Sequence, residues 1–220
     1  MNEPQSLPLF PLPLVVCPSE VIPLHIFEPR YRDLMAWCRS EQGEGRSGSF
    51  VIALGHGEKL SEVATVVRLA RVLKEYPDGQ LDVAVQGLFR CRIAQVRTEH
   101  RYQTADCTRF DDRHADWDEA LATQAYVLHN QLLKLGTGEV LDPSAYAGRT
   151  ALSFFMAPTS GLGMAERQQL IEMTDETGRL RFMVRHLQDL IDQITHVHAS
   201  LASIQGGVGV LSLLRSSRSG

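Results

Sequence analysis

The amino-acid sequence predicts an α+β protein in which a strand-rich first half precedes a helical second half. Up to residue 110 the apolar residues form short runs or alternate with polar ones, and turn-forming Pro, Gly, Asp and Ser separate the runs, as in β-strands. Beyond residue 117 they recur every three or four positions, as on one face of a helix. A polar stretch separates the two halves. We therefore expect a β-rich subdomain at 1–112, a helical bundle at 113–205 and a flexible tail at 206–220.

The opening segment is one of the most apolar in the chain, although six prolines interrupt it between residues 7 and 29. Proline lacks a backbone donor and is found in sheets at edges, strand starts and bulges. We therefore expect an edge strand at Leu7–Val16 and a second short strand at Val21–Ile26. Pro29 suits the first position of a helix. Apolar residues follow it at helical spacing, at Tyr31, Leu34, Met35 and Cys38.

Further strands follow before residue 111. The sequence Tyr76-Pro77-Asp78-Gly79 predicts a turn between two of them, because Pro presets φ and Gly accepts a positive φ. Gly87 permits a bulge or a bend between the next two. The expected strands are Phe50–Leu54, Val63–Leu73, Leu81–Gln86, Leu88–Val96 and Tyr102–Phe110.

Helical spacing of the apolar residues predicts four helices in the second half. Gly136-Thr137-Gly138 should end the first, which begins at Trp117. Asp142-Pro143 has the cap-then-first-turn chemistry of a second helix that runs through Met156. Gly206-Gly207 should end the fourth. The four helices are expected at 117–135, 142–156, 164–173 and 175–203.

Composition argues against several classes of protein. A net charge of −4 and a pI near 6.1 do not suit a dedicated nucleic-acid binder. The charge-free run Pro4–Ser19 is shorter than the roughly 20 residues of a membrane span and is broken by prolines. The acidic start, Met1-Asn2-Glu3-Pro4, does not suit a signal peptide. Four widely spaced cysteines without a C-x-x-C motif predict small buried thiols in a cytoplasmic protein.

Three stretches of the chain resemble the N-terminal domain of Lon proteases, and come closest to the stand-alone bacterial proteins that carry only that domain. Together they cover most of residues 7–194. Cys17-Pro18-Ser19-Glu20 departs from the family, which usually shows an aromatic residue, proline and glycine there. The three stretches are LPLFPLPLVVCPSEVIPLHIFEPRYRDLM at the start, PDGQLDVAVQGLFRCRI in the hairpin and MAERQQLIEMTDETGRLRFMVRHLQDLI in the closing helices.

The resemblance implies a PUA-like β-barrel followed by an α-helical bundle, in agreement with the strand-then-helix order. It also implies that this region recognises substrate while hydrolysis is done elsewhere. The chain contains no Gly-Lys pair, so it lacks the phosphate-binding loop of an ATPase. Its 220 residues are too few for an ATPase module and a protease module together. We expect a non-catalytic protein with no cofactor and no metal.

Three functional hypotheses follow. The first is a cytoplasmic module that binds exposed hydrophobic or unfolded polypeptide, or a specific protein partner. The second is an RNA-binding PUA-like protein that uses Arg90 and Arg92. Nearby Asp78 and Asp82, and the absence of interleaved aromatic residues, instead favour a solvated face or internal ion pairs. The third, an enzyme, has no nucleophile–base or metal-binding constellation to support it.

Candidate contact residues fall in two segments. The segment at 154–164 has apolar ends and a Pro/Gly-rich middle, and methionine adapts to varied partners, so we expect partial exposure of its methionines. The alternative is that its two phenylalanines only close the bundle core. In the opening segment Phe27 is expected to pack where the strands meet the helix, and His25 has a structural role, bonded to a carboxylate or carbonyl, as its alternative. The candidates for binding a polypeptide or partner are Phe155, Met156, Leu162, Met164, His25, Phe27 and Tyr31.

Overall fold

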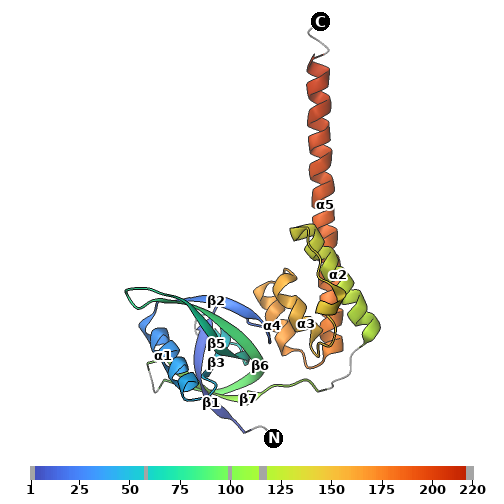
Figure 1. Ribbon diagram of the computed structural model, residues 1–220. Helices are drawn as coiled ribbons and strands as arrows, with labels where there is room; N and C mark the ends of the chain where they lie inside the picture. The colour runs from blue at the N-terminus through green and yellow to red at the C-terminus, as the bar shows by residue number, and fades with distance from the viewer. Residues whose placement is uncertain (1–2, 57–58, 99–100, 114–117, 217–220) are drawn as a thin grey trace.

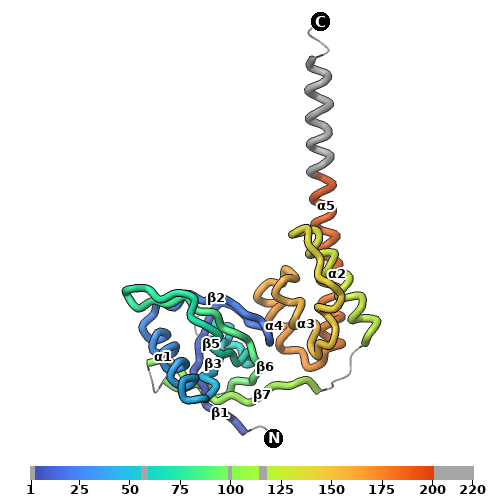
Figure 2. Tube along the Cα trace, viewed as in Figure 1, coloured from blue at the N-terminus to red at the C-terminus, as the bar shows by residue number. Residues whose placement is uncertain are grey.

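The computed structural model describes residues 3–56, 59–98, 101–113 and 118–216, and of residues 201–216 the backbone alone. A β-barrel is followed by a helical bundle, and the last helix extends away from the bundle (Figure 1). The chain trace in Figure 2 shows the blue-to-green first half confined to the barrel and the yellow and orange segments to the bundle. The expected fold class, a barrel before a helical bundle, is confirmed.

Five strands of the described chain form the ring of the barrel. They are hydrogen-bonded in the order β1-β7-β6-β5-β3, and a parallel pairing of β1 with β3 closes the sheet on itself. Closure satisfies the backbone edges that an open sheet would expose. The five strands are β1 (Gln5–Leu12), β3 (Ser49–His56), β5 (Val63–Glu75), β6 (Leu81–Arg97) and β7 (Gln103–Arg109).

Two strands and a helix surround this ring. The short strand β4 (Lys59–Leu60) pairs with the end of β3, and β2 (Val21–Ile26) pairs antiparallel with the first part of β6. Helix α1 (Pro29–Gly43) starts with the expected proline. Its buried stripe, which includes Leu34 and Met35, packs against strand residues of the barrel. Burying each such side chain stabilises the fold by about 1.5–3 kcal/mol, which anchors α1 to the barrel.

The helices pack as a bundle around the buried face of the last one. Asp118 caps the first, because its Oδ1 accepts from the backbone N–H of Ala120 at 3.0 Å and of Leu121 at 3.1 Å. That helix ends, as expected, at a glycine pair whose Gly138 has a left-handed φ of 77°. The elements are α2 (Glu119–Thr137), η1 (Pro143–Ala145), α3 (Leu152–Met156), η2 (Ala157–Thr159), α4 (Met164–Glu172) and α5 (Glu176–Ser216).

The single helix predicted from Asp142 through Met156 is wrong. Asp142 does act as a cap, since its Oδ1 accepts from the backbone N–H of Ser144 at 2.8 Å. Only the three-residue turn η1 follows it, and α3 begins at Leu152. Between them Gly148 has a φ of 69°, a left-handed conformation that interrupts a right-handed helix. The segment is therefore two short turns joined by a loop.

The last helix is longer than expected. Glycine has low helix propensity, so the Gly206-Gly207 pair predicts an end that the structure does not show: α5 extends to Ser216. The expected flexibility of 206–220 stays a prediction. So does the subdomain division, although the change from strand to helix falls between β7 and α2. Trp117 and most of the polar stretch lie outside the described residues.

The turn before β2 lies against β6 at Gly87. The backbone N–H of Gly87 donates to the Glu20 carbonyl at 2.8 Å, and the Gly87 carbonyl accepts from the Ser19 N–H at 2.9 Å. A Cβ at Gly87 would lie 2.2 Å from the Cys17 carbonyl oxygen, so only glycine fits. The expected bulge is present here as a register shift against β5. Ser19 of this turn has a left-handed φ of 68°, a conformation that is uncommon for residues other than glycine.

Helix α4 attaches to the barrel near this turn. The guanidinium of Arg167 forms an ion pair with Glu20, and its Nε donates to the Val15 carbonyl at 3.1 Å. The side-chain amide of Gln168 donates to the Val63 carbonyl at 3.0 Å. Each bond satisfies a barrel carbonyl or carboxylate next to the bundle. The start of β2 is thereby held to the bundle.

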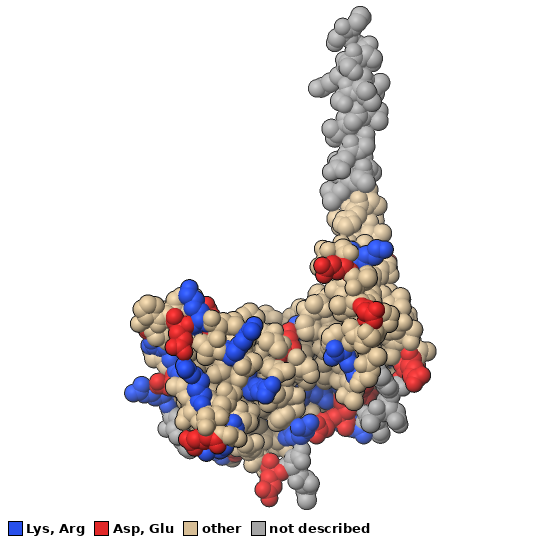
Figure 3. All heavy atoms as spheres, viewed as in Figure 1, with Lys and Arg blue, Asp and Glu red and all other residues tan. Residues whose placement is uncertain are grey.

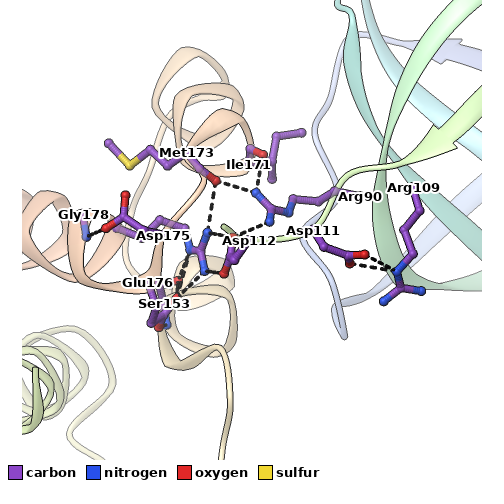
Figure 4. Close-up of polar contacts among 11 residues, drawn as sticks. Arg90, Arg109, Asp111, Asp112, Ser153, Ile171, Met173, Asp175, Glu176 and Gly178 are labelled. Carbon is purple, nitrogen blue, oxygen red and sulfur yellow. Dashed lines mark hydrogen bonds and ion pairs between the residues drawn. The ribbon is translucent and has the colours of Figure 1, made fainter. Parts of the chain in front are cut away.

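A buried arginine of the barrel reaches into the bundle. From β6, Arg90 donates through Nη1 to the carbonyls of Ile171 at 2.9 Å and Met173 at 2.5 Å (Figure 4). Its Nη2 lies 2.5 Å from Oδ1 of Asp112. Burial lowers the pKa of Arg90, and the Asp112 carboxylate opposes this effect. Arg90 therefore ties β6 to the end of α4.

A second arginine shares the same carboxylate. Arg179 of α5 has none of its side chain exposed and donates to Asp112 through Nη1 at 2.7 Å. It also pairs with Glu176 at 2.7 Å and donates through Nε to the Ser153 hydroxyl at 3.0 Å. Burial opposes ionisation of Asp112, but its bonds to Arg179 and Arg90 outweigh burial and lower the pKa of the carboxyl. Asp112 thus joins a cation of barrel strand β6 to a cation of helix α5.

Replacing Arg179 with methionine should destabilise the protein by about 3–5 kcal/mol, because it leaves Glu176 buried without its cation and removes one of the two cations that bind Asp112. The matched control is Arg92→Met, which removes an exposed pair with Glu62 at 3.4 Å and a cation–π contact with the Phe110 ring at 4.8 Å. It should change stability far less, because exposed ion pairs contribute little. Urea unfolding of both variants checks the prediction. Equal midpoints for the two variants would contradict it.

Replacing Gly87 with alanine should destabilise the protein by about 1–3 kcal/mol, because the new Cβ overlaps the Cys17 carbonyl and forces the turn away from β6. The same change at Gly136 of α2 should be neutral or stabilising, since nothing lies within 4 Å of its Cβ position and alanine is the better helix former. Thermal unfolding of both variants measures the difference. A Gly87→Ala protein as stable as Gly136→Ala would show that the turn does not depend on this contact.

Candidate functional site

Apolar side chains are exposed in a row along β2. Because successive side chains of a strand point to opposite faces, Val21, Pro23 and His25 face outward, and Phe27 continues the alternation just beyond the strand. Val21 is 56% exposed and Phe27 is 59% exposed. We refer to these four residues as the β2 stripe. Its two ends are among the most exposed large apolar side chains of the described chain.

A groove of about 330 Å³ opens beside the Phe27 end of the stripe. The ends of β1 and β2 and the first turn of α1 line it. At its base the rings of Phe10 and Tyr31 stack with centroids 3.8 Å apart, and both are buried. Arg30 lies over the Tyr31 ring at 4.6 Å and pairs with Glu28 at 2.8 Å. The groove therefore has an aromatic base and a charged rim.

The expectation that Phe27 packs between the strands and the helix is wrong. Ile26, its neighbour, is buried and takes the core position, because the strand alternation places residue 26 inward and residue 27 outward. Truncating Phe27 therefore creates no core cavity. As a contact residue Phe27 stays a prediction, and its exposure leaves the ring free for a partner.

His25 is held by the β5–β6 hairpin. Its Nδ1 lies 2.7 Å from Oδ1 of Asp82 and its Nε2 lies 2.8 Å from Oε1 of Gln80, which confirms the structural role bonded to a carboxylate. The bond to Asp82 is the main cause that raises the pKa of His25 above its ordinary value. The imidazole also stacks with the Phe27 ring at a centroid distance of 6.1 Å. His25 therefore links the hairpin to the exposed end of the stripe.

The second candidate segment is mostly core. Met156 has none of its surface exposed, so the expectation of partial exposure is wrong for it, whereas Met164 is 51% exposed, as expected. Phe155 and Leu162 are half-buried against the bundle core, and Phe154 is fully part of it. The short helix α3 places Met156 in the bundle core. Binding by Phe155, Leu162 and Met164 stays a prediction.

The structure brings three of the seven candidates, His25, Phe27 and Tyr31, to one groove. The other four belong to the bundle. Of these only Met164 is well exposed, at the start of α4, one turn before the arginine that holds this helix to the beginning of β2. The two groups therefore lie on neighbouring elements but do not form one site.

A larger cleft of about 630 Å³ lies between the barrel and the bundle. Most of its charged side chains already have partners: Arg90 is paired with Asp112, and Arg109 with Asp111 at 2.8 Å (Figure 4). Opening these pairs for a ligand would leave charges uncompensated in a partly buried region. We therefore place the candidate site at the groove, which needs no such rearrangement.

The two arginines considered for RNA do not form a free basic patch. Arg90 is buried in the junction, and Arg92 pairs with Glu62 at 3.4 Å. Both cations also lie over the Phe110 ring, at 4.9 and 4.8 Å. The expectation of internal ion pairs or a solvated face is confirmed: Arg90 forms an internal pair, and Arg92 lies on a solvated face.

The described residues offer little other chemistry. No three His, Cys, Asp or Glu side chains among them are placed to hold a metal ion. None of the helices in this part of the chain is long and apolar enough to span a membrane. All four cysteines are free and buried, as expected. Burial raises the pKa of Cys17 and of Cys38 to about 12, which keeps these thiols protonated and unreactive at neutral pH.

Sequence reasoning missed Val21 and Pro23 as surface residues of the site. A readable signal was present, because the strand carries large residues on both faces and only one face of a strand at the margin of a barrel can be buried. Pairing with β6 decides which face that is. The sequence alone does not contain this pairing.

Comparison with known proteins identifies the family. The family model for the ATP-dependent protease La (LON) substrate-binding domain matches residues 6–189. A Lon protease of Xanthomonas oryzae pv. oryzae is 30% identical over 211 residues, covering 87% of this chain and 24% of the relative. A Lon protease of Trichlorobacter lovleyi is 28% identical over 195 residues, covering 80% of this chain and 23% of the relative. The chain thus spans about a quarter of the length of these relatives.

Solved structures agree with this result. The N-terminal domain of a Mycobacterium avium complex Lon protease superposes with a TM-score of 0.68 at 21% identity, covering 84% of this chain and 99% of that one. A Lon N-terminal domain protein from Xanthomonas campestris gives a TM-score of 0.62 at 26% identity, covering 82% of this chain and 98% of that one. At 21% identity, the Mycobacterium avium complex structure supports the fold alone. With the family model matched over most of the sequence, the chain belongs to the family of Lon substrate-binding domains.

Proposed function

We propose that this chain is a non-catalytic module that binds exposed hydrophobic segments of unfolded polypeptide through the β2 stripe and the adjoining groove. The observation that carries the proposal is the row of outward-facing residues on β2, which ends at an exposed phenylalanine beside an aromatic groove. Contiguous exposed apolar surface on a soluble domain marks an interaction site. Membership of a substrate-binding family supports the same reading.

The groove has the composition of a contact surface rather than of a catalytic one. Its lining is aromatic, aliphatic and proline-rich, with a His–Asp bond and an Arg–Glu pair at the rim. An apolar centre with a polar rim is the usual anatomy of a binding interface. The prolines add apolar surface without unsatisfied backbone donors. Such a surface can accept different side chains of a flexible client.

The proposal assigns no hydrolysis to this chain. Its relatives are named Lon protease, but the match is confined to about a quarter of their length and to the substrate-binding domain. We propose that the chain presents bound polypeptide, or a protein partner, to activities located elsewhere. The four free buried thiols are what a reducing compartment permits and support the proposed cytoplasmic location.

Replacing both Val21 and Phe27 with serine should weaken binding of a carboxymethylated, permanently unfolded protein about tenfold. Lost apolar contact costs about 25 cal/mol per Å², and roughly 1.4 kcal/mol corresponds to a factor of ten. Fluorescence anisotropy of the labelled client measures the affinity. The midpoint of urea unfolding should stay within error, because both side chains are exposed.

The matched control is Val140→Ser on the bundle, where the valine is 60% exposed. It removes an exposed apolar area similar to that of Val21 alone, far from the stripe in sequence, and should leave the affinity unchanged. Equal affinities for wild type, control and the double variant would remove the stripe from the binding site. Equal losses in control and double variant would mean that binding is not localised.

The electrostatics of His25 give a further prediction. Since the bond to Asp82 raises the pKa of His25, its contribution to holding β2 on the hairpin is complete below the ordinary pKa of histidine. It is lost as the pH rises through the folded-state pKa. In an NMR titration the His25 ring should titrate above about 6.5, the ordinary value, and Asp82→Asn should bring it back down. An unshifted titration in wild type would contradict the bond.

A further inference from the structure

The β2 stripe is one edge of a wider ordered face. Residues paired directly across antiparallel strands point to the same side of a sheet. The outward residues of β2 pair with residues of β6, and these pair in turn with residues of β5. Three rungs result: Val21 with Gln86 and Arg68, Pro23 with Ala84 and Arg71, and His25 with Asp82 and Lys74.

Two irregularities of β5 bring its cations into line. Arg68, Arg71 and Lys74 are three residues apart, so in a regular strand the middle one would face the opposite side from the other two. A register shift lies between Leu69 and Arg71, and another between Val72 and Lys74. Each shift adds one residue to β5, so the next cation faces the same side as the one before it. All three cations therefore share the outward face of the β2 stripe. We refer to them as the cationic row.

The cationic row has little negative charge to neutralise it. All three side chains are exposed, and none forms an ion pair with a carboxylate in the described part of the chain. Arg68 donates to the neutral amide oxygen of Gln86 at 2.8 Å, and the Lys74 ammonium lies 4.3 Å above the Tyr76 ring.

The acid within the rungs, Asp82, has its pKa lowered mainly by its bond to His25 and only weakly by the charge of Lys74. Asp82 bonds to His25 at 2.7 Å and accepts from the Tyr76 hydroxyl at 2.7 Å. The side of the barrel turned to the viewer in Figure 3 likewise carries more Lys and Arg than Asp and Glu side chains. The row therefore retains positive charge for a partner.

We propose that this face selects unfolded segments in which acidic residues accompany the apolar ones. Strands lie about 4.8 Å apart, so the β2 stripe and the cationic row run about 10 Å from each other on either side of β6. The small side chain of Ala84 lies between them. A segment laid along β6 places apolar side chains on the stripe and carboxylates on the row. The inference rests on the proposed function and names the class of client.

Three synthetic peptides test the preference. They share the same apolar residues and differ only in whether the residues between them are Glu, Ser or Lys. The Glu peptide should bind wild-type protein about tenfold more tightly than the Lys peptide, since three exposed charge contacts each contribute modestly. The difference should shrink as salt is raised, because exposed charges are screened over about 8 Å at physiological ionic strength.

A triple variant isolates the row. Arg68→Gln, Arg71→Gln and Lys74→Gln together should abolish the preference for Glu while leaving binding of the Ser peptide unchanged. The matched control changes three exposed cations of the bundle, Lys134, Arg181 and Arg185, to glutamine. It alters the net charge equally and should keep the preference.

Each remaining result overturns a claim. Equal binding of the Glu and Lys peptides, or a preference that the bundle control also loses, rejects the acidic preference and leaves the proposed function standing. Failure of wild-type protein to bind any of the peptides rejects the proposed function and the inference with it. Salt-dependent binding of homopolymeric RNA that only the row variant abolishes would make the row a nucleic-acid site and overturn the preference.

Discussion

The packing of the bundle on the barrel depends on one partly buried carboxylate. Asp112 binds a barrel cation, Arg90, and a bundle cation, Arg179, and without it these two arginines would lose the carboxylate that they share. Buried ion pairs stabilise little relative to a hydrophobic contact, but an unpaired member is costly. The network therefore opposes any shift of the bundle that separates one of these charges from its partner.

This junction also decides which surface stays open. The bundle holds the beginning of β2 through Arg167 and Glu20, and the other end of β2 leads into the groove beside α1. The strand is thus fixed at both ends while its outward face is uncovered in the described structure. A rigid strand loses little conformational entropy when a client binds. Rigidity of the receptor suits a partner that is itself disordered.

Much of the fold could be predicted from the sequence, because the signals were local. The period of the apolar residues, Pro29 at a helix start and the cap Asp142 all act within one turn. What failed depended on distant contacts. Burial of Met156 and exposure of Phe27 follow from how α3 and β2 are packed, not from their own composition. The partners of Asp112 lie far along the chain.

The cationic row shows the same limit most clearly. Read as an ordinary strand, β5 places Arg71 opposite to Arg68 and Lys74, and no charged face is visible in the sequence. Two bulges change which side of the sheet the later residues of β5 face, and so create a charged face. Each bulge leaves a residue unpaired and disturbs the ladder, so the hydrogen bonding of β5 alone gives no reason for them. The proposed role of the aligned face gives a reason for the bulges. An apolar stripe supplies affinity but distinguishes poorly among hydrophobic segments, whereas a charged row beside it discriminates by the sign of the client's charge.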